Sequence, residues 1–341
     1  MEVFRSLAEA GSLRGCAVAI GNFDGVHLGH RRLFEVARAR AGARGAPAVA
    51  LTFEPHPARV LRPELAPPLL TPLGRKLELM EGCGLDAVVV QPFDLAWAQT
   101  GARAFVERDL CRRLGAAEVV VGYDFTAGHE RARAPELGEM LRACGSALEV
   151  VQPVTAEGLT VSSTKIREFL LEGRPDAAAL LLGRPHDVEG VAERGAGRGR
   201  ALGFPTANLR PEAMLPANGV YAVRVRLGAP VGGGGVTGTW DATRWDGVCN
   251  VGVKPTVEQE APVTAEAHLL GFDGRDLHGH RVRIAFLVRL REERRFPSVE
   301  DLRAQIGRDV ERAREALRRA PMYVRVVGSP RDFARIGTRL S

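Results

Sequence analysis

The sequence predicts an α/β doubly wound parallel-sheet domain followed by a mostly antiparallel β-barrel domain with a C-terminal helix. The chain has 341 residues, more than one compact core usually serves, so we expect two domains. In the first half, short apolar runs alternate with segments of helical spacing, which is typical of a parallel sheet. In the second half, apolar and polar residues alternate one by one, as in half-buried antiparallel strands.

Five apolar runs predict the strands of the first domain. They are bounded by Gly, Pro or Asp and cover residues 17–20, 46–53, 85–90, 118–121 and 148–151. Between these runs, the spacing of apolar residues around Leu33 and from Ala102 to Leu114 predicts helices. Ligands of such sheets bind at the carboxyl ends of the strands, where the loop from Gly21 to His30 follows the first run.

The pattern of apolar and polar residues changes in the second half of the chain. Residues 221–227 and 282–290 alternate with period two and predict half-buried strands, and Gly232–Gly235 between them indicates a flexible hairpin insertion. Ser298 and Asp301 resemble a capping box that opens a terminal helix with one apolar face. The expected domains are 1–183 and 184–320, followed by a tail of unknown role at 321–341.

The composition limits the classes of partner and compartment. The chain carries 47 Lys and Arg against 41 Asp and Glu, but only three are lysines and the arginines are spread along the sequence, so no nucleic-acid partner is expected. Its five cysteines contain no C-x-x-C pair and indicate neither disulfides nor a zinc site. The N-terminus lacks a signal pattern and no apolar run approaches about 18 residues, so we expect a cytoplasmic protein without a membrane partner. Oligomerisation is left open.

The loop after the first strand reads G-N-F-D-G-V-H-L-G-H. His27 and His30 flank Gly29 at the start of the next helix, where backbone N–H groups, the helix dipole and two imidazoles converge on one anion. Gly21 and Gly25 permit turn dihedrals and close approach of a ligand. The loop therefore predicts a phosphate site. The alternatives are a tight turn with incidental histidines, and a metal site, for which no third ligand cluster is near.

This loop resembles the nucleotidyltransferase signature in the form found in prokaryotic bifunctional riboflavin kinase/FMN adenylyltransferases (FAD synthetases). The resemblance covers almost the whole chain, because several long motifs occur in the family's order. These motifs are F-E-P-H-P at 53–57, V-V-G-Y-D-F at 120–125, S-S-T-K-I-R at 162–167, G-R-A-L-G-F-P-T-A-N-L at 199–209, G-V-Y-A-V at 219–223, G-V-C-N-V-G-V-K-P-T at 247–256 and A-E-A-H-L-L at 265–270.

For the first domain, the resemblance implies adenylylation of FMN by ATP, which yields FAD and pyrophosphate. The FMN phosphate is already anionic, so the reaction needs alignment and charge neutralisation more than a general base. By the resemblance, His27 and His30 are catalytic and hold the triphosphate. The other implied ATP- and phosphate-binding residues are Gly21, Asn22, Phe23, Asp24 and Gly29 in the loop, and Ser162, Ser163, Thr164 and Arg167 at the start of a later helix.

The flavin side of this first site departs from the family. His56, Asp124 and Phe125 are the implied flavin-binding residues, although His56 between two prolines is equally compatible with a structural turn. The family usually has an aromatic residue before the glycine that follows Asp-Phe, whereas this chain has Thr126, Ala127 and Gly128, and continues to Arg131. Loss of an aromatic contact weakens stacking by roughly 0.5–1.5 kcal/mol.

For the second domain, the resemblance implies phosphorylation of riboflavin to FMN. The 5′-hydroxyl is a poor nucleophile and calls for a general base and a metal, for which the family's positions are Glu266 as base and Thr206 with Asn208 as ligands of Mg²⁺. Gly195 to Arg200 would form a flexible loop over the ATP phosphates. Gly271 and His278 depart from the family's usual residues and concern flavin affinity.

Two alternatives remain at this point. One is a riboflavin kinase whose adenylyltransferase domain is impaired or takes another phosphorylated substrate. The other is a flavin-binding regulatory protein, which would predict a dispensable Glu266 and salt-dependent binding of nucleic acid.

Overall fold

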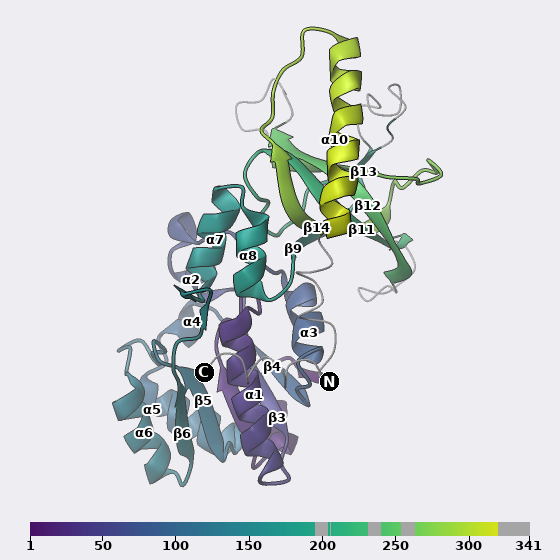
Figure 1. Cartoon of the computed structure of the whole chain (residues 1–341). Helices are drawn as coiled ribbons and strands as arrows, with labels where there is room; N and C mark the ends of the chain where they lie inside the picture. Colours follow the sequence, from purple (N-terminus) through teal and green to yellow (C-terminus); the bar gives the residue numbers. More distant parts are fainter. Residues whose placement is uncertain (195–203, 205, 231–239, 254–262, 320–341) are drawn as a thin grey trace. The chain divides into compact units, whose positions relative to one another are not determined.

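The computed structural model describes residues 1–194, 204, 206–230, 240–253 and 263–319. The chain divides into two compact units, Met1–Ser162 and Ser163–Ser341 (Figure 1). The predicted insertion at Gly232–Gly235 and the tail at 321–341 lie outside the described residues.

The first unit is built on a six-stranded sheet with the order β1-β4-β3-β2-β5-β6. Every neighbouring pair in it is parallel, as the alternation of apolar runs and helical spacing predicted. The strands are β1 Glu2–Phe4, β2 Ala17–Ile20, β3 Ala48–Glu54, β4 Ala87–Pro92, β5 Glu118–Gly122 and β6 Ala147–Val151. The edge strand β1 was not predicted, because three residues carry too little pattern and its pairing with β4 alone defines it.

Helices connect these strands. They are η1 Ala10–Leu13, α1 Leu28–Gly42, α2 Pro57–Leu61, η2 Pro63–Leu65, α3 Leu73–Glu81, α4 Leu95–Ala98, α5 Ala102–Ala104, η3 Phe105–Leu114 and α6 Ala134–Ala143. The helix expected from Ala102 to Leu114 is confirmed as α5 followed by η3, and η3 is a π-helix. A wider turn brings residues four and five positions apart to one face, which matches the buried Phe105, Val106 and Leu110. A short hairpin, β7 Thr155–Ala156 with β8 Leu159–Thr160, precedes the end of the unit.

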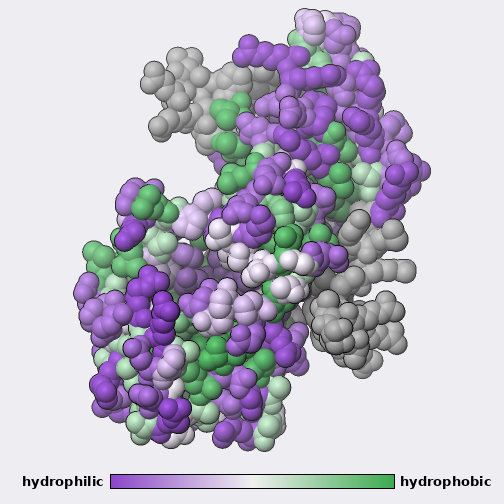
Figure 2. Space-filling view, turned by 60° about the vertical axis from the view of Figure 1, so that its left-hand side comes forward, coloured by the Kyte–Doolittle hydropathy of each residue, from purple (hydrophilic) through white to green (hydrophobic). Residues whose placement is uncertain are grey.

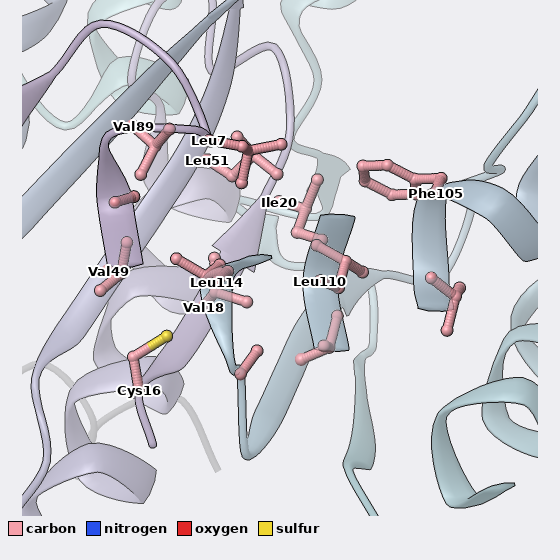
Figure 3. Packing of buried hydrophobic residues seen from close by; sticks show 14 of the residues in the cluster. Leu7, Cys16, Val18, Ile20, Val49, Leu51, Val89, Phe105, Leu110 and Leu114 are labelled. Atoms are coloured by element: carbon pink, nitrogen blue, oxygen red, sulfur yellow. The ribbon is translucent and has the colours of Figure 1, made fainter. Parts of the chain in front are cut away.

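Two apolar layers cover the two faces of the sheet, which is the doubly wound arrangement. On one face, Val18, Ile20 and Leu51 pack with Leu110 and Leu114 of η3 (Figure 3). The other face presents small residues to helix α1. These residues are Ala17, Ala19, Ala48 and Ala50, and they pack with Leu33, Phe34 and Ala37 of α1. Short side chains on that face allow α1, which begins at the phosphate loop, to lie close to the strands.

The second unit begins with two helices and continues into an antiparallel sheet. The elements are α7 Ser163–Leu171, α8 Pro175–Leu182, β9 His186–Val191, β10 Thr206–Leu209, β11 Gly219–Pro230, β12 Trp240–Val253, β13 Val263–Leu269, β14 His280–Arg291 and α10 Val299–Arg319. The strand order is β10-β13-β12-β11-β14-β9, and every pair is antiparallel. The N–H of Glu193, just after β9, donates to the carbonyl of Asn208 at 2.8 Å and joins the two ends of the sheet. The predicted small barrel is therefore confirmed.

The barrel has an inner core and a separate outer layer under α10. The alternating residues Tyr221, Val223 and Val225 are buried inside, whereas Val220 and Ala222 point outward and pack with α10. The predicted start of α10 is confirmed, because Ser298 Oγ accepts the N–H of Asp301 at 3.1 Å. Helix α10 therefore covers β11 and its neighbours, and the outer face of β10 and β13 is not part of this apolar layer.

Helices α7 and α8 belong by their contacts to the second unit. Helix α8 packs against β9 and β14, and the N–H of Ala217 donates to the carbonyl of Leu170 at 2.8 Å. The chain turns out of α8 at Gly183, whose φ of 66° ends the helix in the left-handed conformation.

On the face shown in Figure 2, hydrophilic residues predominate and hydrophobic ones form smaller patches between them. Among the described residues, no helix has both the length and the apolar composition needed to cross a membrane. All five cysteines have free thiols.

Candidate functional sites

The phosphate loop lies at the carboxyl edge of the first sheet, at the position where the strand order reverses. It follows β2, whose parallel neighbours are β3 and β5, so the loops after these three strands share one edge. The loop is tied to β3 by two hydrogen bonds, from Gly21 N–H to the Leu51 carbonyl at 3.1 Å and from Thr52 Oγ1 to the Asn22 carbonyl at 3.2 Å. A reversal of strand order is where ligands of doubly wound sheets bind.

His27 and His30 stack on each other at the start of α1. Their ring centroids are 3.5 Å apart at an angle of 17°. His27 is the N-cap residue, and its Nδ1 accepts the N–H of His30 at 3.3 Å. Because Nδ1 accepts, a neutral His27 ring carries its proton on Nε2 and offers an N–H donor there. The two-histidine motif thus forms one unit at a helix N-terminus.

His30 is held in a buried environment that disfavours its charge. Burial lowers the pKa of His30 well below 6.5, and the nearby His27 and Lys76 lower it further. The Phe23 ring packs against it edge-on, at a centroid distance of 5.3 Å. Its Nδ1 is buried without a hydrogen-bond partner among the described residues, which is uncommon for a buried polar atom.

The backbone of the loop adopts left-handed conformations at residues that rarely take them. Phe23 has a φ of 51° and the β-branched Val26 a φ of 42°. Such strain is found mainly at functional sites, where surrounding contacts enforce it. At Gly29, a Cβ atom would lie 3.2 Å from the His27 ring, so a larger residue would displace that imidazole.

Asp24 anchors the loop to the segment before α3. Its carboxylate accepts the N–H groups of Leu70 and Thr71 at 2.9–3.0 Å and the Thr71 hydroxyl at 3.2 Å. Thr71 Oγ1 in turn accepts the N–H of Gly25 at 2.9 Å. The side chain of Asp24 is 2% exposed, so the described bonds assign it a positioning role beneath the phosphate loop. Sequence reasoning missed Thr71, which carries no local motif.

Lys76 is a second residue that sequence reasoning missed. It lies on α3 and is 2% exposed, which is unusual for lysine. Burial lowers the pKa of Lys76, and the carboxylates of Glu54 and Asp24 oppose that shift. Its effect on the pKa of His30 places this cation near the phosphate loop. The signal in the sequence was its rarity, since the chain has three lysines.

The residues implied on the flavin side lie after the neighbouring strands. His56 follows β3 and is the N-cap residue of α2, where its Nδ1 accepts the N–H of Ala58 at 3.2 Å. Asp124 and Phe125 follow β5, with Asp124 exposed and Phe125 packed partly against the core. They share an edge with His27 and His30 by topology, and their role in binding stays a prediction.

The altered segment from Thr126 to Arg131 forms a tight turn closed by two main-chain hydrogen bonds between Ala127 and Ala132, at 2.9 and 3.0 Å. The Glu130 carboxylate accepts the N–H of Ala102 at 2.9 Å and thereby caps the helical stretch that begins there. Hydrogen bonds from its own N–H and from Ala102 lower the pKa of Glu130. The residues that replace the family's usual ones thus have a structural role.

The S-S-T motif spans the division between the units. Ser162 is the last residue of the first unit, while Ser163, Thr164 and Arg167 belong to α7 in the second. Within the first unit, the carbonyl of Val161 lies 3.8 Å from the position that a Cβ atom on Gly29 would take. The chain therefore passes close to the H-x-G-H motif at Val161, one residue before the S-S-T motif begins. The helix starts at Ser163, so the motif lies at the beginning of a helix, as expected.

A second polar site lies on the outer face of the barrel. Glu266 on β13 is paired directly with Asn208 on β10, and one row away Thr206 is paired with His268. Residues directly opposite in antiparallel strands have Cβ atoms about 4.5–5.5 Å apart on the same face. The structure thus brings Glu266 to Asn208 and Thr206, which lie 58 and 60 positions before it in the sequence.

The same row continues to a residue that sequence reasoning did not assign. Asn250 on β12 is paired with Glu266 from the other side, and its Nδ2 donates to Glu293 Oε1 at 3.2 Å. Asn250 lies within the G-V-C-N-V-G motif, but Glu293 follows β14 and has no local signal. The strand register therefore brings Asn250 beside Glu266, and the loop after β14 brings Glu293 to Asn250.

The remaining predicted positions belong to the second unit. Gly195 and Arg200, expected in a loop over the ATP phosphates, lie outside the described residues. Gly271 has a φ of 75°, which favours glycine at that turn, and His278 is exposed. Among the described residues, no group of three or more His, Cys, Asp or Glu side chains is arranged to hold a metal ion.

Two family models match the chain, one for each half. A model described as FAD synthetase matches residues 9–165, and one described as riboflavin kinase matches residues 182–317.

Proteins named bifunctional riboflavin kinase/FMN adenylyltransferase are similar over most of the chain. The one from Pseudomonas fluorescens is 38% identical over 88% of this chain and 93% of its own length. The one from Haemophilus influenzae is 35% identical over 92% of this chain and 98% of its own, and that from Escherichia coli K12 is 34% identical over 88% and 92%. A crystal structure titled macrolide-efflux protein from Streptococcus pneumoniae is similar with a TM-score of 0.79 and 28% identity, covering 92% of this chain and 98% of that one.

Proposed function

The chain belongs to the bifunctional riboflavin kinase/FMN adenylyltransferase family, and from this premise we propose which of its residues perform the two reactions. The kinase reaction transfers the γ-phosphate of ATP to riboflavin and gives FMN. The adenylyltransferase reaction joins FMN to the AMP part of ATP and gives FAD. We assign the first reaction to the outer face of the barrel and the second to the phosphate loop of the parallel sheet.

In adenylylation, an FMN phosphate oxygen attacks the α-phosphorus of ATP while the bond to pyrophosphate breaks. The nucleophile is already anionic, so the protein must mainly align the two phosphates and neutralise charge. His27 Nε2–H and the free N–H groups at the start of α1 are the donors that we assign to the triphosphate. His30 would bind the triphosphate through its buried ring. The negative charge of the phosphates would then offset the cost of protonating a buried imidazole.

The backbone around these donors is fixed by contacts that do not depend on ATP. Asp24 holds Leu70 and Thr71, and Thr71 holds Gly25, so the loop is arranged before the ligand arrives. Preorganised donors cost little reorganisation in the transition state. Ser162 and Arg167 are proposed as further phosphate contacts, with support from the motif alone.

In the kinase reaction, Glu266 accepts the proton of the riboflavin 5′-hydroxyl as its oxygen attacks the γ-phosphorus of ATP and ADP leaves. The observation that carries this assignment is the strand register that places Glu266 directly beside Asn208, with Thr206 on the same face. The neutral oxygens of Thr206 and Asn208 suit Mg²⁺, a hard cation that keeps part of its water shell. When bound, Mg²⁺ would reduce the negative charge of the ATP phosphates.

We place the protein in the cytoplasm. Its substrates include ATP, and its cysteines are all free, as in proteins of reducing compartments.

The two assignments are tested by separating the activities with single substitutions. We expect Glu266→Gln to lower the formation of FMN by roughly 10²–10⁴-fold, the usual contribution of a general base, and to leave the conversion of FMN to FAD intact. His27→Asn should give the reverse pattern. Both reactions are followed by chromatography of the flavins, with Glu292→Gln as the control because its side chain is 85% exposed.

The same assay decides the alternatives. A Glu266→Gln enzyme that still makes FMN at the normal rate would reject Glu266 as the base. Wild-type protein that makes FMN but no FAD, even when supplied with FMN and ATP, would show that the first domain is not a working FMN adenylyltransferase.

A further inference from the structure

Asn250 continues the row of proposed kinase residues on the outer face of the barrel. Its strand β12 pairs with β13 so that Asn250 lies directly opposite Glu266, and with β11 so that it also lies opposite Val220. Val220 belongs to the apolar layer under α10. Asn250 therefore stands between the proposed base and the edge of the helix, on the side of Glu266 away from β10.

The Asn250 amide has a defined orientation. Its Nδ2 donates to Glu293 Oε1 at 3.2 Å, and a carboxylate can accept only from the nitrogen end of an amide. The Oδ1 oxygen of Asn250 consequently points away from Glu293, and no described residue donates to it. This leaves a neutral acceptor beside Glu266.

The loop that carries the exposed Glu293 is anchored on both sides of this residue. At Gly252, a Cβ atom would lie 2.6 Å from Glu293 Oε1, so the carboxylate rests directly on that glycine. The flanking arginines tie the loop to α10. Arg291 binds the buried Asp309 at 2.8 Å, and Arg294 donates to Gln305. Asp309 also accepts from Gln305 at 2.7 Å, which closes the network.

The positions of these groups suggest which part of the substrate each would meet. In phosphoryl transfer, the attacking and leaving oxygens lie roughly in line on opposite sides of the phosphorus. Thr206 and Asn208, proposed for the metal and phosphates, lie on the β10 side of Glu266, so the attacking alcohol belongs on the β12 side. Riboflavin bears a chain of hydroxyl groups there, and hydroxyl groups donate to amide oxygens.

We propose that Asn250 Oδ1 accepts a hydrogen bond from the ribityl chain of riboflavin, and that Glu293 is a positioning residue that fixes the Asn250 amide in that orientation. This inference rests on the roles proposed above for Glu266, Thr206 and Asn208. In this proposal Asn250 contacts riboflavin and Glu293 supports Asn250. Together they set the affinity for riboflavin and leave the affinity for ATP unchanged.

The test measures KM for each substrate of the kinase reaction in matched variants. We expect Asn250→Ala and Glu293→Leu each to raise KM for riboflavin roughly five- to tenfold, the effect of one lost hydrogen bond, with KM for ATP and the Mg²⁺ dependence unchanged. Gly252→Ala should reproduce the Glu293→Leu effect by displacing the carboxylate. Glu293→Gln keeps an acceptor oxygen and should restore most of the affinity, and Glu292→Leu is the surface control.

Non-additivity distinguishes positioning from a separate structural role. Because Glu293 acts through Asn250, the double variant should be no worse than Asn250→Ala alone. Inhibition by lumiflavin, which lacks the ribityl chain, should be unchanged in every variant and shows that the barrel is folded. If Asn250→Ala does not fold, Asn250→Ser takes its place.

Several outcomes would overturn the proposal. They are an unchanged KM for riboflavin in Asn250→Ala, a rise in KM for ATP or in the Mg²⁺ requirement instead, and additive losses in the double variant. Failure of the proposed role of Glu266 as the base gives a different result. In that case Glu266→Gln would keep its kinase activity, whatever the Asn250 variants do.

Discussion

His30 is the residue whose chemistry depends most on its surroundings. The ring is neutral in the folded protein because burial, followed by His27 and Lys76, lowers its pKa well below 6.5. The unfolded chain binds a proton at this residue near pH 6.5, whereas the folded chain does not until a lower pH. The free energy of unfolding should therefore fall as the pH drops below about 6.5.

Urea titrations between pH 5 and pH 8 test this expectation. The slope below pH 6.5 should be smaller in His30→Asn than in the wild type. His278→Asn, a substitution of an exposed histidine, serves as the control. An identical slope in His30→Asn would show that the buried ring does not contribute to the pH dependence.

Asp24 shows how a residue of a binding motif can act through the backbone. Asp24→Ala leaves the N–H groups of Leu70 and Thr71 without their buried acceptor, so we expect a loss of about 2–4 kcal/mol in the free energy of unfolding. The loop that Asp24 supports should also lose affinity for ATP. Chemical denaturation and ATP titration measure the two effects, and a change confined to ATP affinity would contradict the anchoring role.

At the scale of elements, the turn at 127–132 supports the helical stretch that begins at Ala102. Gly128 has a φ of 70°, and a Cβ atom there would lie 2.2 Å from the Ala102 nitrogen. Gly158 has a similar φ of 76° but open space around it, so it is a matched control. We expect Gly158→Ala to cost about 1 kcal/mol through its backbone alone, and Gly128→Ala to cost clearly more.

Thermal unfolding of both variants measures this difference. Equal losses would mean that the turn moves away from Ala102 without cost. FAD formation by Gly128→Ala, measured alongside, reports whether the turn also matters to adenylylation.

Periodicity predicted the elements with long, regular patterns and missed those without them. The apolar runs of β2 to β6 and the alternation in β11 and β14 were recognised, because burial on one or both faces leaves a direct trace in the sequence. The short strand β1 was not recognised, since it has three residues, and the pattern around η3 predicted a helix without indicating its π-type hydrogen bonds.

At the scale of the whole molecule, the structure suggests where the chain can be divided. Helices α7 and α8 pack within the second unit, where Leu181 and Leu182 are fully buried. A fragment that begins at residue 163 should therefore unfold at a higher temperature than one that begins at residue 184, which exposes the surface of β9 and β14 under α8. Calorimetry of the two fragments tests this, and equal transition temperatures would support the sequence-based division at 183.

The sequence by itself determined the two fold classes and the family, because each depends on residues that are contiguous or regularly spaced. The tertiary structure alone decided which distant residues meet. The register of β10, β13 and β12 places Asn208, Glu266 and Asn250 in one row, and the loop after β14 brings Glu293 to it. Pairing between strands far apart in the chain leaves no local pattern, since it is fixed by the packing of the whole barrel.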